Sequence, residues 1–180
     1  TIDITPSVSV VAGQNKITNE PIATIGGGET RQFVLMPGQY INLETQGPAG
    51  ADLTGTHIQA SGPVVVFGGH ECANIPLGTN YCDHVEQQLF PVSSWGSQFV
   101  VSSFFPRGNG DSQVFRILAS EDQTLLTTTP AQPNVDNLTL NRGEFVEFIS
   151  NQDFEVSATA PILIGQYMRG SRSPGGASKG

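Results

Sequence analysis

Apolar and polar residues alternate along most of this chain, with the two-residue period of a β-strand. No segment shows the 3.6-residue apolar spacing of an amphipathic helix. Gly, Pro, Asn and Asp interrupt the alternation where tight turns are expected, at Gly26–Gly28, Pro37–Gly38, Gly108–Asp111 and Asn141–Gly143. The pattern predicts an all-β chain with little or no helix, and we expect an antiparallel β-sandwich.

Segments rich in β-branched and aromatic residues are predicted to be strands. The segment from Thr127 to Asn137, rich in Pro, Asn and Thr, is predicted to be a loop. The Gly- and Ser-rich residues 170–180 are predicted to form a flexible linker or tail. The predicted strands are Thr30–Leu35, Val64–Phe67, Phe99–Phe104, Val114–Leu118, Phe145–Ile149 and Pro161–Gln166.

Two pairs of similar segments indicate an internal duplication. Residues 35–43 align with 140–148, and residues 58–66 align with 156–164. In each copy a proline, Pro63 or Pro161, precedes an apolar run, as expected at the start of a strand that needs no donor there.

The duplication predicts one β unit over residues 1–169, built of two jelly-roll-like pseudo-repeats. These repeats would cover about 15–70 and 114–169. The segment 70–100 between them has no counterpart in the second copy. It is either a plain connector or the functional elaboration of the fold.

Charged residues are scarce, since they make up 13% of the 180 residues against about 25% in an average domain. The net charge of −8 and the lack of a basic cluster exclude the usual electrostatics of nucleic-acid binding. No run approaches the ~20 apolar residues of a membrane-spanning helix, so the chain is not expected to span a membrane. A polar, weakly charged surface favours an extracellular or cell-surface protein.

The two cysteines, Cys72 and Cys82, are separated by nine residues. This spacing fits neither the short C-x-x-C pattern of zinc sites nor a redox motif. A disulfide is therefore favoured, while free thiols and metal ligands remain alternatives. A disulfide would place the chain in an oxidising compartment.

Pairing of these cysteines across an antiparallel ladder would fix the residues around them. His70 would lie opposite His84, and Glu71 opposite Asp83, with the histidines on one face and the carboxylates on the other. Opposed histidines could chelate a zinc ion, so His70, His84 and Asp83 are the candidate metal ligands. No ligand spacing matches a known zinc pattern, and packing or hydrogen-bonding roles are favoured for the histidines. No metal and no cofactor is predicted.

The rest of this segment adds polar and aromatic candidates. Asp83 and Glu86 could act as a carboxylate pair or bond the loop backbone. Trp95 could stack on sugar rings together with Phe90, Phe104 and Phe105, or it could pack in the core, which is favoured because a strand pattern follows it. The candidate binding residues are His70, Glu71, Asp83, His84, Glu86 and Trp95.

No catalytic motif is found in the sequence. There is no G-x-S-x-G elbow, and Gly26–Gly28 lacks the lysine and the helix of a phosphate loop. Gly108–Asp111 with Glu121 and Asp122 could bind calcium, but these residues fit no calcium-loop pattern. The chain is expected not to be an enzyme.

Four stretches of the chain resemble the N-terminal domain of the IgG Fc-binding protein family, which includes bacterial members. They lie between about Leu53 and Tyr167 and read GPVVVFGGHECANIP, YCDHVEQQLFPVSSWGSQFVV, RILASEDQT and APILIGQY. A glycine pair before a cysteine, a CDH…EQ…P run and V-S-x-W-G are expected in that family. The first fifty residues carry no such motif. The resemblance implies adhesion or contact with a host glycoprotein, and it does not imply IgG binding, because no residue matches an Fc contact.

We therefore expect a non-catalytic module that binds a protein or glycan ligand on a surface. This module would be displayed on a surface itself or be part of a larger multidomain or fibrous chain. One alternative is a metal-dependent hydrolase or carbohydrate-active enzyme that uses His70, Asp83, His84 and Glu86. Another alternative is a structural spacer in a fibre.

Overall fold

The structure is a computed structural model that describes residues 1–45, 51–76, 78, 82–107 and 110–169. Apart from one 3-10 turn, η1 (Val92–Ser94), the regular elements of this described part are β-strands, which confirms the all-β prediction. The predicted tail lies outside the described residues. The chain divides into two compact units, Thr1–Val64 and Val65–Gly180, and each is described by itself.

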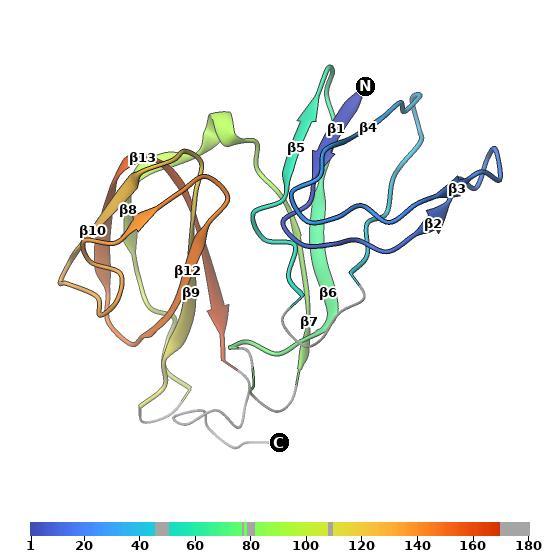
Figure 1. The fold of residues 1–180 in the computed structure, drawn as a ribbon. Coiled ribbons are helices and arrows are strands. Elements are labelled where there is room, and N and C mark those ends of the chain that lie inside the picture. The colour runs from blue at the N-terminus through green and yellow to red at the C-terminus, as the bar shows by residue number, and fades with distance from the viewer. Residues whose placement is uncertain (46–50, 77, 79–81, 108–109, 170–180) are drawn as a thin grey trace. The chain divides into compact units, whose positions relative to one another are not determined.

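The first unit is built on a three-stranded antiparallel sheet in the order β4-β1-β5 (Figure 1). Its strands are β1 (Ile2–Thr5), β4 (Arg31–Phe33) and β5 (His57–Ala60), and a separate ribbon pairs β2 (Gly13–Gln14) with β3 (Pro21–Ile22). Ile2 and Ile4 alternate with polar residues along β1 and are buried, together with Val10 and Ile25. The core of this unit is therefore small.

The glycine-rich turn of the first unit forms as predicted but joins strands that do not pair with each other. The Glu29 N–H donates to the Gly26 carbonyl at 3.0 Å, and Gly28 adopts a φ of 78°, which favours glycine. The strand before the turn pairs with β2 and the strand after it pairs with β1. The turn is thus not a hairpin.

The second unit holds a six-stranded sheet that depends on one long strand, β13 (Phe154–Met168). The first part of β13 pairs with β10 (Thr124–Thr129) on one side and with β8 (Gly96–Val101) on the other. Its last seven residues pair with β9 (Gln113–Ala119), which in turn pairs with β12 (Phe145–Ser150). A strand that changes partners at an irregularity is typical of the corner of a sandwich.

The main hydrophobic core lies in this second unit. Phe115 and Ile117 of β9 alternate with outward residues and are fully buried. The Phe115 ring lies 5.5 Å from Phe148 of β12 and 5.2 Å from Phe154 of β13, the latter in an edge-to-face arrangement. Such ring pairs add about 0.5–1.5 kcal/mol each beyond their area burial, so they tie three strands together.

Several strand boundaries differ from the prediction because hydrogen-bonded partners, rather than apolar runs, decide where strands lie. Val64 and Val65 are exposed and outside any strand. Pro161 lies inside β13 rather than at a strand start, and its missing N–H falls within the register shift between Ser157 and Ile162. The two aligned copies thus differ at their prolines, and the duplication stays a prediction.

The predicted loop from Thr127 begins later than expected, because β10 continues to Thr129. Threonine is β-branched and suits a strand, although its polarity weakens the alternating pattern. A two-residue strand, β11 (Thr139–Leu140), pairs with the start of β10 beyond the loop.

Asp111 is an acid whose pKa is strongly perturbed by its surroundings. Its carboxylate accepts hydrogen bonds from the Arg107 Nε at 3.0 Å, the Arg107 Nη2 at 3.1 Å and the backbone N–H groups of Arg107 and Ser112. The side chain is 6% exposed. The Arg107 hydrogen bonds, together with these N–H groups, lower the pKa of Asp111 to about 2. The protein itself therefore holds this loop acid, through Arg107 and the two backbone N–H groups.

The lowered pKa predicts a loss of stability in acid. The ionised form is favoured in the folded state, so its contribution of about 2 kcal/mol is present above the unfolded pKa and disappears as pH falls from about 4 to about 2. Asp111→Asn should lower the free energy of unfolding at about pH 6 and have little effect at about pH 2. Urea unfolding at both pH values measures this, and an equal effect at both would contradict the prediction.

Candidate functional site

The candidate segment forms a hairpin of two strands, β6 (Phe67–Ala73) and β7 (Asp83–Gln88) (Figure 1). A disulfide joins Cys72 to Cys82 at its end, with the two Cα atoms 4.8 Å apart, which confirms the predicted pairing. Two-stranded ribbons are marginal by themselves in water, so the disulfide is the main local constraint on this hairpin.

The pairing around the disulfide differs from the predicted one. His70 lies opposite Val85 rather than His84, and Asp83 lies opposite Ala73 rather than Glu71, which are offsets of one and two residues. Between these pairs, Glu71 and Cys72 together oppose the single residue His84, which is a β-bulge. The prediction assumed that Cys72 and Cys82 face each other in a continuous ladder, whereas Cys72 lies in the bulge opposite His84.

The shift separates the two histidines because a one-residue slip moves a side chain to the other face. The Nδ1 atom of His70 accepts a hydrogen bond from the Cys72 N–H at 2.9 Å, so His70 supports the bulge. His84 lies instead 3.4 Å from Glu86, measured from Nε2 to Oε2. The predicted opposed histidine pair is therefore wrong, and within the described residues no three His, Cys, Asp or Glu side chains gather closely enough to hold a metal ion.

Four of the predicted site residues lie in the bulge or on the strand that faces it. We call Glu71, Asp83, His84 and Glu86 the bulge cluster. The Asp83 carboxylate accepts the His84 backbone N–H at 2.9 Å, and the side chains of His84 and Glu86 are 62% and 61% exposed. Such solvated groups suit reversible hydrogen bonds and charge contacts with a ligand, whereas proton-transfer catalysis needs groups held around a substrate.

Trp95 does not belong to the bulge cluster. It follows η1, is half-buried and donates its indole N–H to the Phe90 carbonyl at 3.2 Å. Phe104 and Phe105 lie beyond the far end of β8, and a six-residue strand spans about 20 Å. The single aromatic platform that the sequence suggested is therefore wrong.

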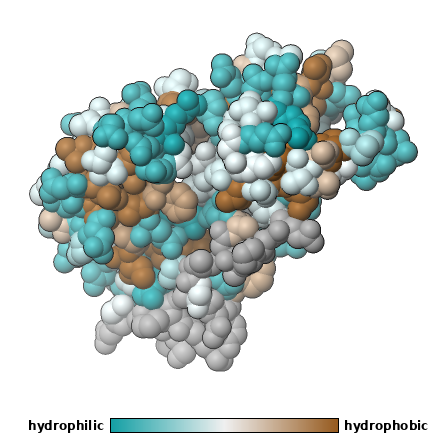
Figure 2. Space-filling model, in the orientation of Figure 1, coloured by the Kyte–Doolittle hydropathy of each residue, from teal (hydrophilic) through white to brown (hydrophobic). Residues whose placement is uncertain are grey.

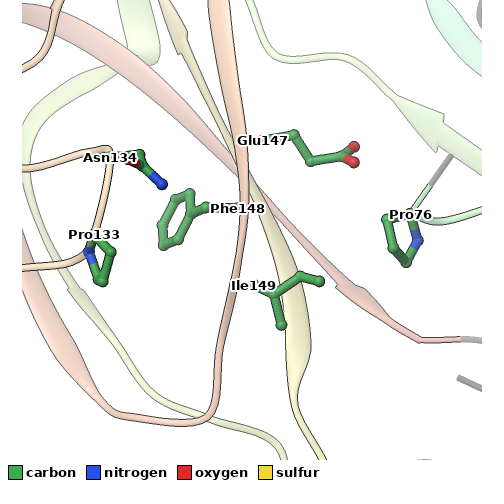
Figure 3. A pocket seen from close by; sticks show the side chains of 6 residues that line it. All are labelled: Pro76, Pro133, Asn134, Glu147, Phe148 and Ile149. Atoms are coloured by element: carbon green, nitrogen blue, oxygen red, sulfur yellow. The ribbon is translucent and has the colours of Figure 1, made fainter. Parts of the chain in front are cut away.

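A pocket of about 300 Å³, which no sequence motif predicted, lies beside β12 (Figure 3). Glu147 is the acid in its wall, and it pairs with Arg116 at 2.7 Å. The arginine also faces the rings of Phe145 and Tyr167, at 5.1 and 5.7 Å from their centroids. No short motif contains these residues, because three distant segments supply the walls. The lining residues are Pro76, Pro133, Asn134, Glu147, Phe148 and Ile149.

Gly69 is predicted to be essential for the hairpin. A Cβ atom at this position would lie 2.8 Å from the Val85 carbonyl oxygen, so Gly69→Ala should push the strands apart and cost about 1–3 kcal/mol. Gly68→Ala is the matched control, because its Cβ would meet only Leu89 methyl groups at 3.6 Å. Amide exchange of β6 and β7 should accelerate in the first variant and stay unchanged in the second. Equal exchange in both variants would contradict the prediction.

Removal of the disulfide should open the hairpin and leave the six-stranded sheet folded. The cross-link restricts the unfolded chain by roughly 3 kcal/mol in the loop-entropy model, which exceeds the margin of a lone hairpin. In a variant with both cysteines replaced by serine, amide exchange should rise in β6 and β7 and remain slow in β9 and β13. Faster amide exchange in all of these strands would show that the stability of the six-stranded sheet depends on the disulfide.

Comparisons with known proteins extend the resemblance seen in the sequence. The human protein named IgGFc-binding protein is 33% identical over 84 residues, which make up 47% of this chain and 1% of that protein. The chain thus spans a very small part of this relative. No solved structure matches. The family described as IgGFc binding protein matches residues 1–180, including the first fifty, in which no motif was found. The chain belongs to the IgGFc-binding protein family.

Proposed function

We propose that this chain is a non-catalytic, extracellular module that binds a glycoprotein or glycan on a host or other surface. Its family is named for binding, and the human relative's name describes binding of IgG Fc by that protein. No helix in the described part is long and apolar enough to cross a membrane. The face drawn in Figure 2 carries hydrophilic residues over much of its area, in keeping with a protein exposed to solvent.

The observation that carries this proposal is the bulge cluster. The hairpin exposes several polar side chains on a covalently fixed ribbon, while the hydrophobic cluster of the core is formed without it. Bulges re-aim side chains and are common next to functional sites. A fixed backbone lowers the entropy cost of binding, so a few polar side chains are enough to bind a ligand specifically.

Three residues of the bulge cluster contact the ligand in this proposal, and two residues outside it have supporting roles. Glu71 and Glu86 accept hydrogen bonds from ligand hydroxyl or amide groups, and His84 can donate or accept. His70 positions the bulge through its bond to the Cys72 N–H. Trp95 fixes the chain after β7 through its bond to the Phe90 carbonyl.

The two alternative functions have no specific observation in their favour. An enzyme would need reactive groups in a pocket, and the acid in the pocket beside β12 is neutralised by Arg116. A fibre spacer would leave the bulge cluster without a role.

Binding of immobilised glycoproteins tests the proposal. The probes are human IgG Fc, the same Fc after enzymatic removal of its glycan, and a mucin. We expect at least one probe to bind, and the double variant His84→Ala, Glu86→Gln to weaken that binding by about tenfold or more. Biolayer interferometry measures the dissociation constants.

Glu155→Gln is the matched control, because Glu155 is an exposed carboxylate on β13 outside the hairpin. It should bind like the parent chain. Equal binding by the hairpin variant would contradict the role of the bulge cluster. Loss of binding after removal of the Fc glycan would identify the ligand as the sugar.

A further inference from the structure

The outer backbone groups of β10 and β12 differ in their hydrogen bonding. Along β10, the Leu126 N–H donates to the Leu138 carbonyl at 2.8 Å, and the Thr128 N–H donates to the Asp136 carboxylate at 2.8 Å. The Leu126 carbonyl accepts the Asn137 N–H. The loop after β10 thus closes that edge. Strand β12 stands last in the strand order and has no such cover among the described residues.

The register identifies which backbone groups of β12 point outward. Ala119 directs its N–H and its carbonyl toward the start of β12, at 3.0 Å from Glu144 and Gly143. Bonded and non-bonded pairs alternate in an antiparallel ladder, so the pair of Ile117 with Val146 is also bonded. The residues between the bonded positions direct their N–H and carbonyl groups away from β9. They are Phe145, Glu147 and Ile149.

The pocket beside β12 lies along this open edge (Figure 3). Glu147 and Ile149, which present outward backbone groups, both line it. Pro133 and Pro76 form walls on two sides, and Ile149 is 47% exposed. An added strand needs unpaired backbone groups for its hydrogen bonds and an apolar surface for its side chains, and this edge offers both. Strand β8 also ends a row of paired strands, but it supplies none of the pocket residues.

The charge that would guard this edge is neutralised. Charged side chains on edge strands commonly prevent unwanted strand pairing. Glu147 is the acid within β12, but it is bonded to Arg116 on the neighbouring strand. The two side chains are only 22% and 18% exposed. The edge therefore lacks a free charge opposite an incoming strand.

The charge of the surrounding segment indicates the chemistry of the partner. From Ala119 to Glu155 the chain carries seven carboxylates and one basic residue, and with Glu147 left out because Arg116 neutralises it, the net charge is −5. Glu144 precedes β12, Asp153 follows it and Asp136 lies two residues beyond Asn134. We propose that the β12 edge binds an extended, basic segment of a partner protein, which adds to the sheet as an extra strand. One apolar side chain of that segment occupies the pocket.

A second copy of this chain is a poor occupant of the same edge. Antiparallel pairing of β12 with itself would bring the acidic segments of both copies together, and like charges that meet across paired strands are destabilising. The proposed strand-binding edge is also separate from the bulge cluster, since no residue of the bulge cluster lines the pocket.

The test uses the full chain and a peptide of about ten residues that alternates valine with lysine. We expect binding by calorimetry, and slower amide exchange at Phe145, Glu147 and Ile149. The Ile149→Pro variant removes an outward N–H and should weaken binding by about tenfold or more. Ile149→Val keeps the N–H and is the matched control. The double variant His84→Ala, Glu86→Gln should bind the peptide like the parent chain.

Three peptide controls keep the proposal falsifiable if the proline variant does not fold. N-methyl groups on two successive central residues block both edges of the peptide and should abolish binding. The valine–glutamate peptide should not bind, and about 1 M salt should weaken binding relative to about 0.1 M. Equal binding of the N-methylated peptide, protection outside β12, or no binding at all would overturn the proposal. Dimers of the free chain that Ile149→Pro abolishes would identify a second copy as the occupant and overturn it as well.

Discussion

The second unit depends on the hydrogen bonding of β13, which supplies ladder partners to β10, β8 and β9 in turn. One continuous strand can serve three partners only if it changes its pairing midway. The register shift between Ser157 and Ile162 does this, and Pro161, which has no N–H to donate, lies within it. The Pro161 carbonyl remains in use, because it accepts the N–H and the hydroxyl of Ser120. The packing of Phe115 against Phe148 and Phe154 then follows from strands that β13 has already brought together.

The hairpin of β6 and β7 is stabilised differently. It contributes nothing to the hydrophobic cluster around Phe115, and it holds its shape through a disulfide, a close backbone approach at Gly69 and the bond from Cys72 to His70. The substitution tolerance of the two parts should differ accordingly, since a core accepts volume-conserving changes whereas a glycine at a close approach accepts none. If the hairpin binds the ligand as proposed, this arrangement separates recognition from folding within one chain.

The two edges of the six-stranded sheet at β10 and β12 also differ, because one is closed by hydrogen bonds and the other is open. The loop after β10 satisfies that strand's outer backbone groups with its own carbonyl and carboxylate oxygens, which is a usual protection against aggregation. On β12 the corresponding groups face a pocket, and the acid within the strand is held by an arginine that also stacks near two aromatic rings. An open edge on β12 beside a closed edge on β10 is consistent with the binding of an added strand at β12. Otherwise, only the shortness of β12 limits the number of its exposed backbone groups.

The alternation of polar and apolar residues was enough to establish the all-β class and four of the strands of the second unit, because the two-residue period is local to each strand. The disulfide was predictable for a similar reason, since spacing limits the chemistry of two nearby cysteines. The ladder register was not predictable: Cys72 lies in a bulge opposite His84 rather than opposite Cys82, and no feature of the sequence pattern marks this offset, which leaves His70 opposite Val85. The pocket beside β12 was also absent from the pattern, because Pro76, Pro133 and Ile149 meet only after distant segments fold. Sequence thus determined the local backbone preference and the covalent link, whereas tertiary structure decided which side chains meet, because contacts between segments depend on hydrogen-bond partners that no local period encodes.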